Sequence, residues 1–206
     1  DFDLKSNKLF LLADRYDRVE RIYFGEKIDD KKKESQAKRE YELSQIAKQK
    51  EGAQLDYSTA VMISQTCPNK NLDEIIDLLK EMNVLKKASN RDKERIGKRL
   101  TLAKAWAEKY APEEMKISVQ EEVPQSIINE LNDNEKNAIA ALVNEIDSDD
   151  LQTRIYEIAK ESGIEPKRFF QILYKILLNR ESGPRLGPFI IAIGKDRARK
   201  ILEQIQ

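Results

Sequence analysis

Apolar residues recur along most of the chain at steps of three and four, which is the spacing of one face of an α-helix. The first such stretch ends near Gly25 and carries Leu9, Leu12, Tyr16, Val19 and Tyr23. No stretch alternates strongly between apolar and polar residues as a strand would, and seven Gly and six Pro are few for a turn-rich β protein. The pattern therefore predicts an all-α protein built from two helical subdomains.

The ends of several predicted helices carry residues with a clear physical role. Asn71 can accept hydrogen bonds from the first backbone amides of a helix over 72–82. Pro112 cannot continue a helix and so ends the clearest one, over 91–111. Pro166 fits the first turn of a later helix, where its missing N–H is not needed.

A change in residue composition near residue 119 divides the chain into two parts. Within residues 112–124, apolar residues first alternate with polar ones, and two Glu and a Pro then follow. This composition is typical of an extended linker. We expect a helical connecting part over 1–118 and a second helical part over 119–206. Within the first part, 29–51 is rich in Lys, Glu and Gln with sparse apolar residues, which predicts either a long solvated helix or a mobile arm.

The charge is balanced overall but not along the chain. The 37 Lys and Arg equal the 37 Asp and Glu. Residues 1–118 hold 25 basic and 22 acidic side chains, 119–150 hold 1 and 9, and 151–206 hold 11 and 6. The last segment is therefore the best candidate for contact with an anionic partner, although ordinary solvated helix faces would give the same imbalance.

The composition excludes several kinds of chemistry. The chain has no His, so His-based catalysis and His-ligated zinc are excluded, and one Cys excludes an internal disulfide. We interpret Cys67 as a buried apolar residue and the chain as cytoplasmic. It contains no apolar run of about 18 residues that would cross a membrane. We find no phosphate-binding glycine loop, metal-ligand cluster or activated nucleophile, so we expect no catalytic residue and no metal.

The most informative motif is Gly183–Phe189, which contains two Gly-Pro pairs four residues apart. Each Pro fixes its φ angle, so the motif predicts a stiff turn that holds Arg185 and Leu186 outward. Gly183 leaves backbone uncovered, and a flat base can approach it closely.

Basic and aromatic residues are interleaved around this turn, an arrangement that suits unpaired RNA. Cations neutralise phosphates, while ring faces and guanidinium planes stack on bases. The candidate RNA-binding residues are Lys167, Arg168, Tyr174, Lys175, Arg180, Gly183, Pro184, Arg185, Leu186, Phe189 and Lys195. The alternative is a structural turn with Phe189 in the core and ordinary solvated lysines.

A second basic run lies in the predicted helix over 91–111. Its weaker candidates for contact with an RNA backbone are Arg91, Arg95, Lys98 and Arg99. A solvated helix face is the alternative. Trp106 lies beside the apolar face of the same helix, which favours a core position over stacking on a base.

Several of these segments resemble those of a known family. Tyr16–Gly25, Ala105–Glu114, and Gly183–Phe189 followed by Ile193–Lys195 are similar to segments in the C-terminal part of archaeal-type class I lysyl-tRNA synthetases. The opening residues Asp1–Leu4 resemble the segment just after the catalytic domain of that family. On this likeness, and because the chain starts without Met, we interpret it as the interior of a longer protein.

The resemblance implies an all-helical region that docks the anticodon arm of a lysine-accepting tRNA. It implies a parent enzyme that joins lysine to tRNA with ATP, both held in an N-terminal catalytic domain that would be this region's partner. The signature motifs of that domain are absent, so we expect this chain alone to be inactive and to hold no cofactor. In this interpretation Arg185 donates hydrogen bonds to a base or phosphate, while Pro184 and Leu186 offer apolar faces. The alternatives are a helical protein-interaction or scaffold domain without RNA binding and, more remotely, an enzyme that uses carboxylates alone.

Overall fold

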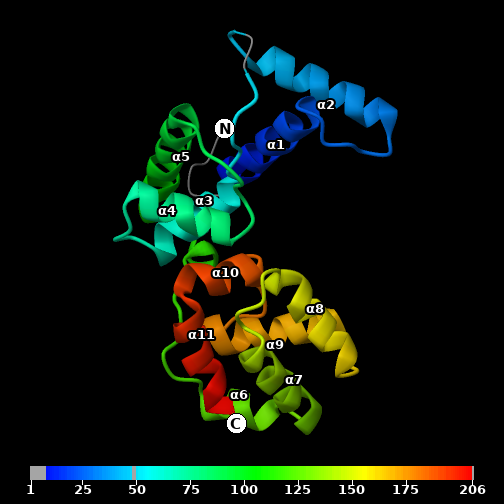
Figure 1. Cartoon of the computed structure of the whole chain (residues 1–206), viewed down its shortest axis with the longest axis vertical. Helices are drawn as coiled ribbons and strands as arrows, with labels where there is room; N and C mark the ends of the chain where they lie inside the picture. The colour runs from blue at the N-terminus through cyan, green and yellow to red at the C-terminus, as the bar shows by residue number, and fades with distance from the viewer. Residues whose placement is uncertain (1–7, 48–49, 206) are drawn as a thin grey trace. The chain divides into compact units, whose positions relative to one another are not determined.

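The computed structural model describes residues 8–47 and 50–205, and every regular element within these ranges is a helix (Figure 1). The prediction of an all-α protein is therefore confirmed. The chain forms two compact units. Unit 1 comprises Asp1–Gln65 and Leu85–Lys116, and unit 2 comprises Thr66–Val84 and Ile117–Gln206. Within the described ranges, no helix is long and apolar enough to span a membrane.

Unit 1 is built on three longer helices and two short ones. They are α1 (Lys8–Tyr23), α2 (Lys31–Ser44), α3 (Tyr57–Thr66), α5 (Asn90–Lys109) and the 3₁₀ turn η1 (Glu113–Met115). The resemblance at Asp1–Leu4 concerns positions outside the described residues.

Helix α2 accounts for most of the charged stretch over 29–51 and packs against α1 (Figure 1). It begins where the Asp30 side chain accepts hydrogen bonds from two backbone amides, and it ends at Ser44. Its anchor is Tyr41, which is 1% exposed and lies with its ring centroid 4.7 Å from that of Tyr23. Together with Ala37, which is also buried, Tyr41 anchors a helix whose apolar residues are otherwise sparse.

The core of unit 1 closes around Trp106 on α5. Its indole is 3% exposed and lies against Phe10 of α1 and Tyr57 of α3, with ring centroids 5.9 and 6.2 Å away. The predicted core position of Trp106 is confirmed. A reciprocal capping box between Ser89 and Asp92 fixes the start of α5.

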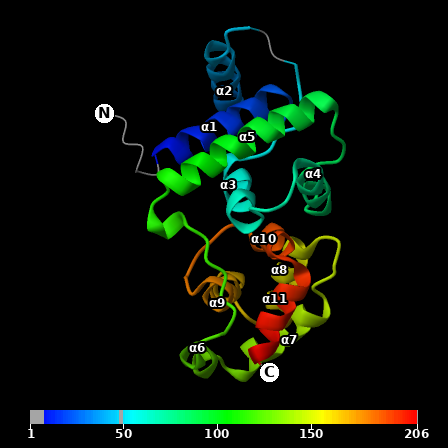
Figure 2. The ribbon, with the colours of Figure 1, turned by 90° about the vertical axis from the view of Figure 1, so that its left-hand side faces the viewer.

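Unit 2 is built of short helices (Figure 2), and its buried residues are mostly apolar. The helices are α4 (Leu72–Glu81), α6 (Gln125–Glu130), α7 (Asp133–Asn144), α8 (Leu151–Glu161), α9 (Pro166–Leu178), α10 (Leu186–Ile193), α11 (Lys195–Leu202) and the 3₁₀ turn η2 (Glu203–Ile205). Helix α10 packs against α4, α8 and α11, and α11 packs in turn against α7 and α9.

The segment 66–84 precedes the linker in sequence but belongs to unit 2 in space. The Cys67 thiol is buried, as predicted, and donates to the carbonyl oxygen of Ala192 with the two atoms 3.2 Å apart. Lys195 on α11 forms an ion pair of 3.2 Å with Glu81 at the end of α4. The compact units therefore differ from a division into 1–118 and 119–206. Helix α4 buries an apolar face, and position along the chain does not show which core receives it.

Candidate nucleic-acid interface

The connection between α9 and α10 is the turn that the Gly-Pro motif marks. It starts where Asn179 adopts a left-handed conformation with φ of 53°, and it ends at Arg185. The hydroxyl of Tyr174 donates a 2.6 Å hydrogen bond to the carbonyl oxygen of Pro184. A Cβ atom on Gly183 would lie 2.9 Å from the Tyr174 ring, so glycine lets the turn lie directly on that ring. Burial raises the pKa of Tyr174, which keeps its hydroxyl protonated as a donor.

The second Gly-Pro pair does not extend this turn, because Gly187 and Pro188 lie in the first helical turn of α10. A Cβ atom on Gly187 would lie 2.7 Å from the backbone nitrogen of Gln152 on α8, and the Gly187 amide donates to Gln152 Oε1 at 2.9 Å. The glycine is thus needed for close contact between helices. The prediction of one stiff turn over Gly183–Phe189 is correct only for its first half.

Two candidate residues are inside the core of unit 2. Leu186 and Phe189 are both 0% exposed, so the expectation that Leu186 points outward is wrong, and neither side chain can stack on a base. Helix α10 is apolar on nearly all sides, because it is enclosed by neighbouring helices. An apolar helix of eight residues, with Pro184 just before it and Pro188 in its first turn, resembles a loop in a sequence.

Arg185 is one of the candidates that the structure leaves open to solvent. It is exposed, and its side chain makes no hydrogen bond or ion pair to any residue within 8–47 and 50–205, although its backbone carbonyl accepts from the Phe189 amide. Asp150 interacts with Arg185 electrostatically: the pKa of Asp150 is lowered mainly by hydrogen bonds from Thr153 and also by Arg185. Gly183, Pro184, Tyr174 and Arg185 are therefore brought together as one exposed feature, which we call the Arg185 turn.

Most of the other predicted cations of unit 2 are paired with carboxylates. Arg168 Nε lies 2.9 Å from Glu135, Lys175 lies 3.3 Å from Glu130, and Lys195 is paired with Glu81. Two of these acids come from the acidic segment 119–150, so the opposite charges of the two segments partly cancel within the unit.

The remaining two predicted cations lie at opposite ends of α9. Lys167 is exposed in its first turn, about 16 Å along the helix from the end of α9 at Leu178, at 1.5 Å per residue. Arg180 lies in the turn after α9 and is half-buried. The predicted set is therefore spread over α9, the turn after it, α10 and α11, and it does not form a single cluster.

In unit 1 the basic face of α5 is held by two buried carboxylates of α1. Arg95 Nη2 donates to both carboxylate oxygens of Glu20 at 2.5 Å, and the Tyr41 hydroxyl donates to the same group at 3.1 Å. Arg99 pairs with Asp17, which also accepts a 2.7 Å hydrogen bond from the Tyr57 amide.

Sequence analysis missed Asp17 and Glu20. The available signal was their position among the apolar residues of α1, where a carboxylate needs a cation. Burial raises the pKa of Asp17, and the neighbouring Arg99 opposes that rise.

Two hollows open on unit 1. One, of about 450 Å³, lies beside the cations of α5 and is lined by Tyr16, Glu20, Gln45, Arg91, Glu94, Arg95 and Lys98. The other, of about 530 Å³, lies between α1 and α2 and is lined by Leu12, Arg15, Gln36, Arg39, Glu40 and Leu43.

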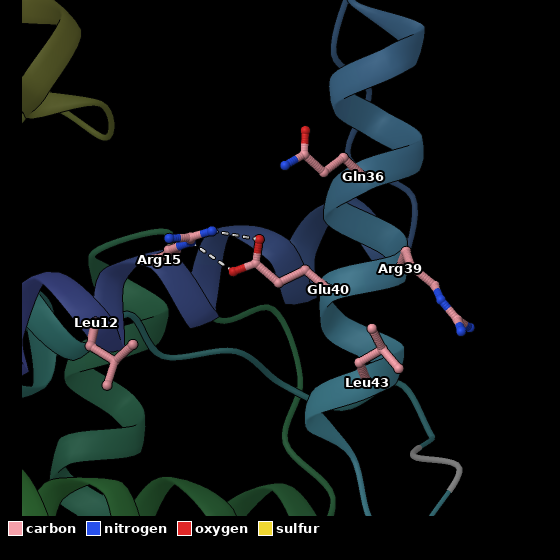
Figure 3. A pocket seen from close by; sticks show the side chains of 6 residues that line it. All are labelled: Leu12, Arg15, Gln36, Arg39, Glu40 and Leu43. Carbon is pink, nitrogen blue, oxygen red and sulfur yellow. Dashed lines mark hydrogen bonds and ion pairs between the residues drawn. The ribbon is translucent and has the colours of Figure 1, made fainter.

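Figure 3 shows that in the second hollow the guanidinium of Arg15 points at Glu40, and Nε lies 2.7 Å from the carboxylate. Arg39 is likewise 3.3 Å from Glu42, so the charges around this hollow are matched. Within the described part of the chain, no group of three acidic or thiol side chains is placed to hold a metal ion.

Comparison with known proteins gives lysine–tRNA ligases among the relatives of this chain, although no family model matches it. A lysine–tRNA ligase of Thermococcus kodakarensis is 36% identical over 198 residues, which cover 91% of this chain and 37% of the relative. Lysine–tRNA ligases of Borreliella burgdorferi and Pyrococcus horikoshii are 35% and 32% identical and cover 97% and 89% of this chain. The chain spans a little over a third of the length of these relatives.

Proposed function

This chain is a relative of the lysine–tRNA ligases, and on that premise we propose that it binds a lysine-accepting tRNA and recognises its anticodon arm. The observation that carries the proposal is the similarity over nine-tenths of the chain to proteins named for that activity. The second support is the Arg185 turn, which combines a fixed backbone with one free guanidinium.

The Arg185 turn acts as the recognition element in this proposal. Tyr174 and Gly183 fix the backbone before RNA arrives, so little conformational entropy is lost on binding. The planar guanidinium of Arg185 donates paired hydrogen bonds to a base edge or a phosphate. Pro184 is half-buried and offers an apolar face beside it. Lys167 on the same helix contributes a backbone contact further along the RNA.

The full ligase reaction belongs to a larger protein in this proposal. Joining lysine to tRNA requires ATP and lysine to be bound in a catalytic domain, and the sequence of this chain holds no motif for either. The chain contributes recognition, while the chemistry takes place on that partner domain. We therefore expect the purified chain to bind tRNA without charging it.

The test is binding of the purified chain to a lysine tRNA and to the same tRNA with a changed anticodon, measured by fluorescence anisotropy. We expect tighter binding to the lysine tRNA, and we expect Arg185→Ala to reduce the ratio of the two affinities. Lys200→Ala is the matched control, since it removes an exposed cation of unit 2 far along the sequence from the turn. An unchanged ratio in Arg185→Ala would remove Arg185 from the recognition role.

The salt dependence separates this proposal from a helical scaffold that binds another protein. Each phosphate contact releases counterions, so the affinity for RNA must fall steeply as salt rises. A contact between apolar helix faces depends much less on salt. Binding that is indifferent to both anticodon and salt would contradict the proposal.

A further inference from the structure

The hollow beside α5 in unit 1 has the chemistry of an anion site. From its geometry we propose that it binds a phosphate group of an RNA backbone, as a second contact with the same RNA that the Arg185 turn is proposed to recognise. The inference rests on the proposed function for the identity of the RNA. The site itself is argued below from unit 1 alone.

Three cations of one helix face line this hollow. Arg91, Arg95 and Lys98 stand four and three residues apart on α5, so their side chains lie on the same face. The hollow of about 450 Å³ is larger than one phosphate group needs, so the adjoining sugar can enter with it.

Arg95 is oriented before any ligand arrives. Its Nη2 atom is fixed on Glu20, a carboxylate that is 3% exposed and also accepts from Tyr41. Its Nε and Nη1 atoms donate no hydrogen bond to the described residues, and a third of the side chain faces solvent. A guanidinium held in this way presents its remaining donors without a further loss of rotamer freedom.

The balance of charge in the hollow favours an anion. Arg95 is compensated by Glu20, and Lys98 is compensated by Glu94 at 2.7 Å. Arg91 is exposed and makes no ion pair with any described side chain; Asp92, whose pKa Arg91 helps to lower, does not line the hollow. The three cations and two carboxylates of the lining therefore leave a net charge of +1. A phosphodiester carries one negative charge, which matches that excess.

Two neutral polar groups complete the wall. Gln45 Nε2 donates to the Tyr16 hydroxyl at 3.2 Å, which links the segment after α2 to α1 across the hollow. The ring of Tyr16 is itself held 5.8 Å from that of Tyr41. Hydroxyl and amide groups beside cations are common partners of phosphate and sugar oxygens.

The test compares Arg91→Ala with Lys104→Ala in the purified chain. Both residues are exposed on α5, but at about 100° per residue Lys104 lies on the far side of the helix from Arg91. Affinity for full-length lysine tRNA is measured by anisotropy over a series of salt concentrations. We expect Arg91→Ala to weaken binding by about threefold to tenfold and to reduce the slope of log affinity against log salt by about one. We expect Lys104→Ala to change neither quantity as much.

The outcomes separate this inference from the proposed function. Phosphate contacts carry no sequence information, so Arg91→Ala should leave the ratio of affinities for native and altered anticodons unchanged. Equal effects of the two variants would overturn the phosphate site while leaving anticodon recognition intact. A loss in Arg91→Ala alone, in a chain that does not discriminate anticodons, would support the site and overturn the proposed function.

A third arm distinguishes RNA from a free phosphate compound as the source of the anion. The wild-type chain and Arg91→Ala are titrated with AMP by calorimetry. We expect no binding of AMP that depends on Arg91, because one phosphate supplies only part of the contact surface of an RNA. If AMP binding depends on Arg91 and tRNA binding does not, the RNA source is wrong.

Discussion

Replacing Glu20 with Gln tests whether buried carboxylates organise unit 1. The substitution keeps the size of the side chain and an acceptor for Tyr41, but it leaves Arg95 beside a neutral amide. Breaking a buried ion pair from one side costs about 3–5 kcal/mol in fully buried pairs. Since a third of the Arg95 side chain faces solvent, water recovers part of that energy, and we expect Glu20→Gln to cost about 2–4 kcal/mol.

The assay exploits the position of the single tryptophan. Trp106 is the one Trp of the chain and lies in the core of unit 1, so its fluorescence reports the unfolding of that unit in urea. Circular dichroism at 222 nm reports both units. We expect the fluorescence midpoint to fall in Glu20→Gln, while the part of the dichroism signal that belongs to unit 2 keeps its midpoint.

Glu94→Gln is the matched control, because it removes a carboxylate from an exposed pair with Lys98 on the same hollow. Exposed pairs contribute little to stability, because water screens both charges. If Glu20→Gln loses no more stability than Glu94→Gln, a buried charge does not hold Arg95. The fixed orientation of Arg95, on which the phosphate site depends, would then be refuted. A double variant of Glu20→Gln with Arg95→Met should recover most of the stability, since no unpaired charge then remains.

Two further predictions concern unit 2. Gly187→Ala should destabilise unit 2 by about 1–3 kcal/mol, because the new methyl group would clash with the backbone of Gln152, which cannot move aside. Thermal melting measures the loss, and an unchanged melting temperature would contradict the close contact. The folded pKa of Tyr174 is raised above its ordinary 10.0, so the stability that its neutral hydroxyl contributes is present below about pH 10 and lost as the pH rises through the folded value. Tyr174→Phe should therefore lose less stability than the wild type between pH 9 and 12, measured in urea titrations at each pH; an equal loss in both proteins would refute this.

The helical class and most helix faces were predictable, since burial repeats along a helix with a fixed period. The cap at Asn71, the stop before Pro112 and the first-turn position of Pro166 were also predictable, because each depends on local backbone chemistry. Trp106 was correctly assigned to the core from its place beside an apolar stripe.

The candidate site was less predictable, because its surroundings come from distant parts of the chain. Arg168 and Glu135 are 33 residues apart, and Arg95 and Glu20 are 75 apart, so no local pattern shows that these cations are paired. Leu186 was misplaced for a related reason. The motif around it has the composition of an exposed turn, and only the helices that enclose α10 bury it.

The pairing of cations with carboxylates divides the predicted RNA contacts into two physical kinds. Lys175 is bound to the exposed Glu130, and a phosphate can replace that partner at a cost of about 0–1 kcal/mol. Arg168 is bound to Glu135, which is 4% exposed. If Arg168 moved away, the buried carboxylate of Glu135 would lack a cationic partner. Arg168 can therefore meet RNA only through donors that Glu135 does not use, as we propose for Arg95 on Glu20. A buried carboxylate thus turns a flexible surface cation into a fixed one, and the cations that bind phosphate most specifically need not be the ones that lack a partner.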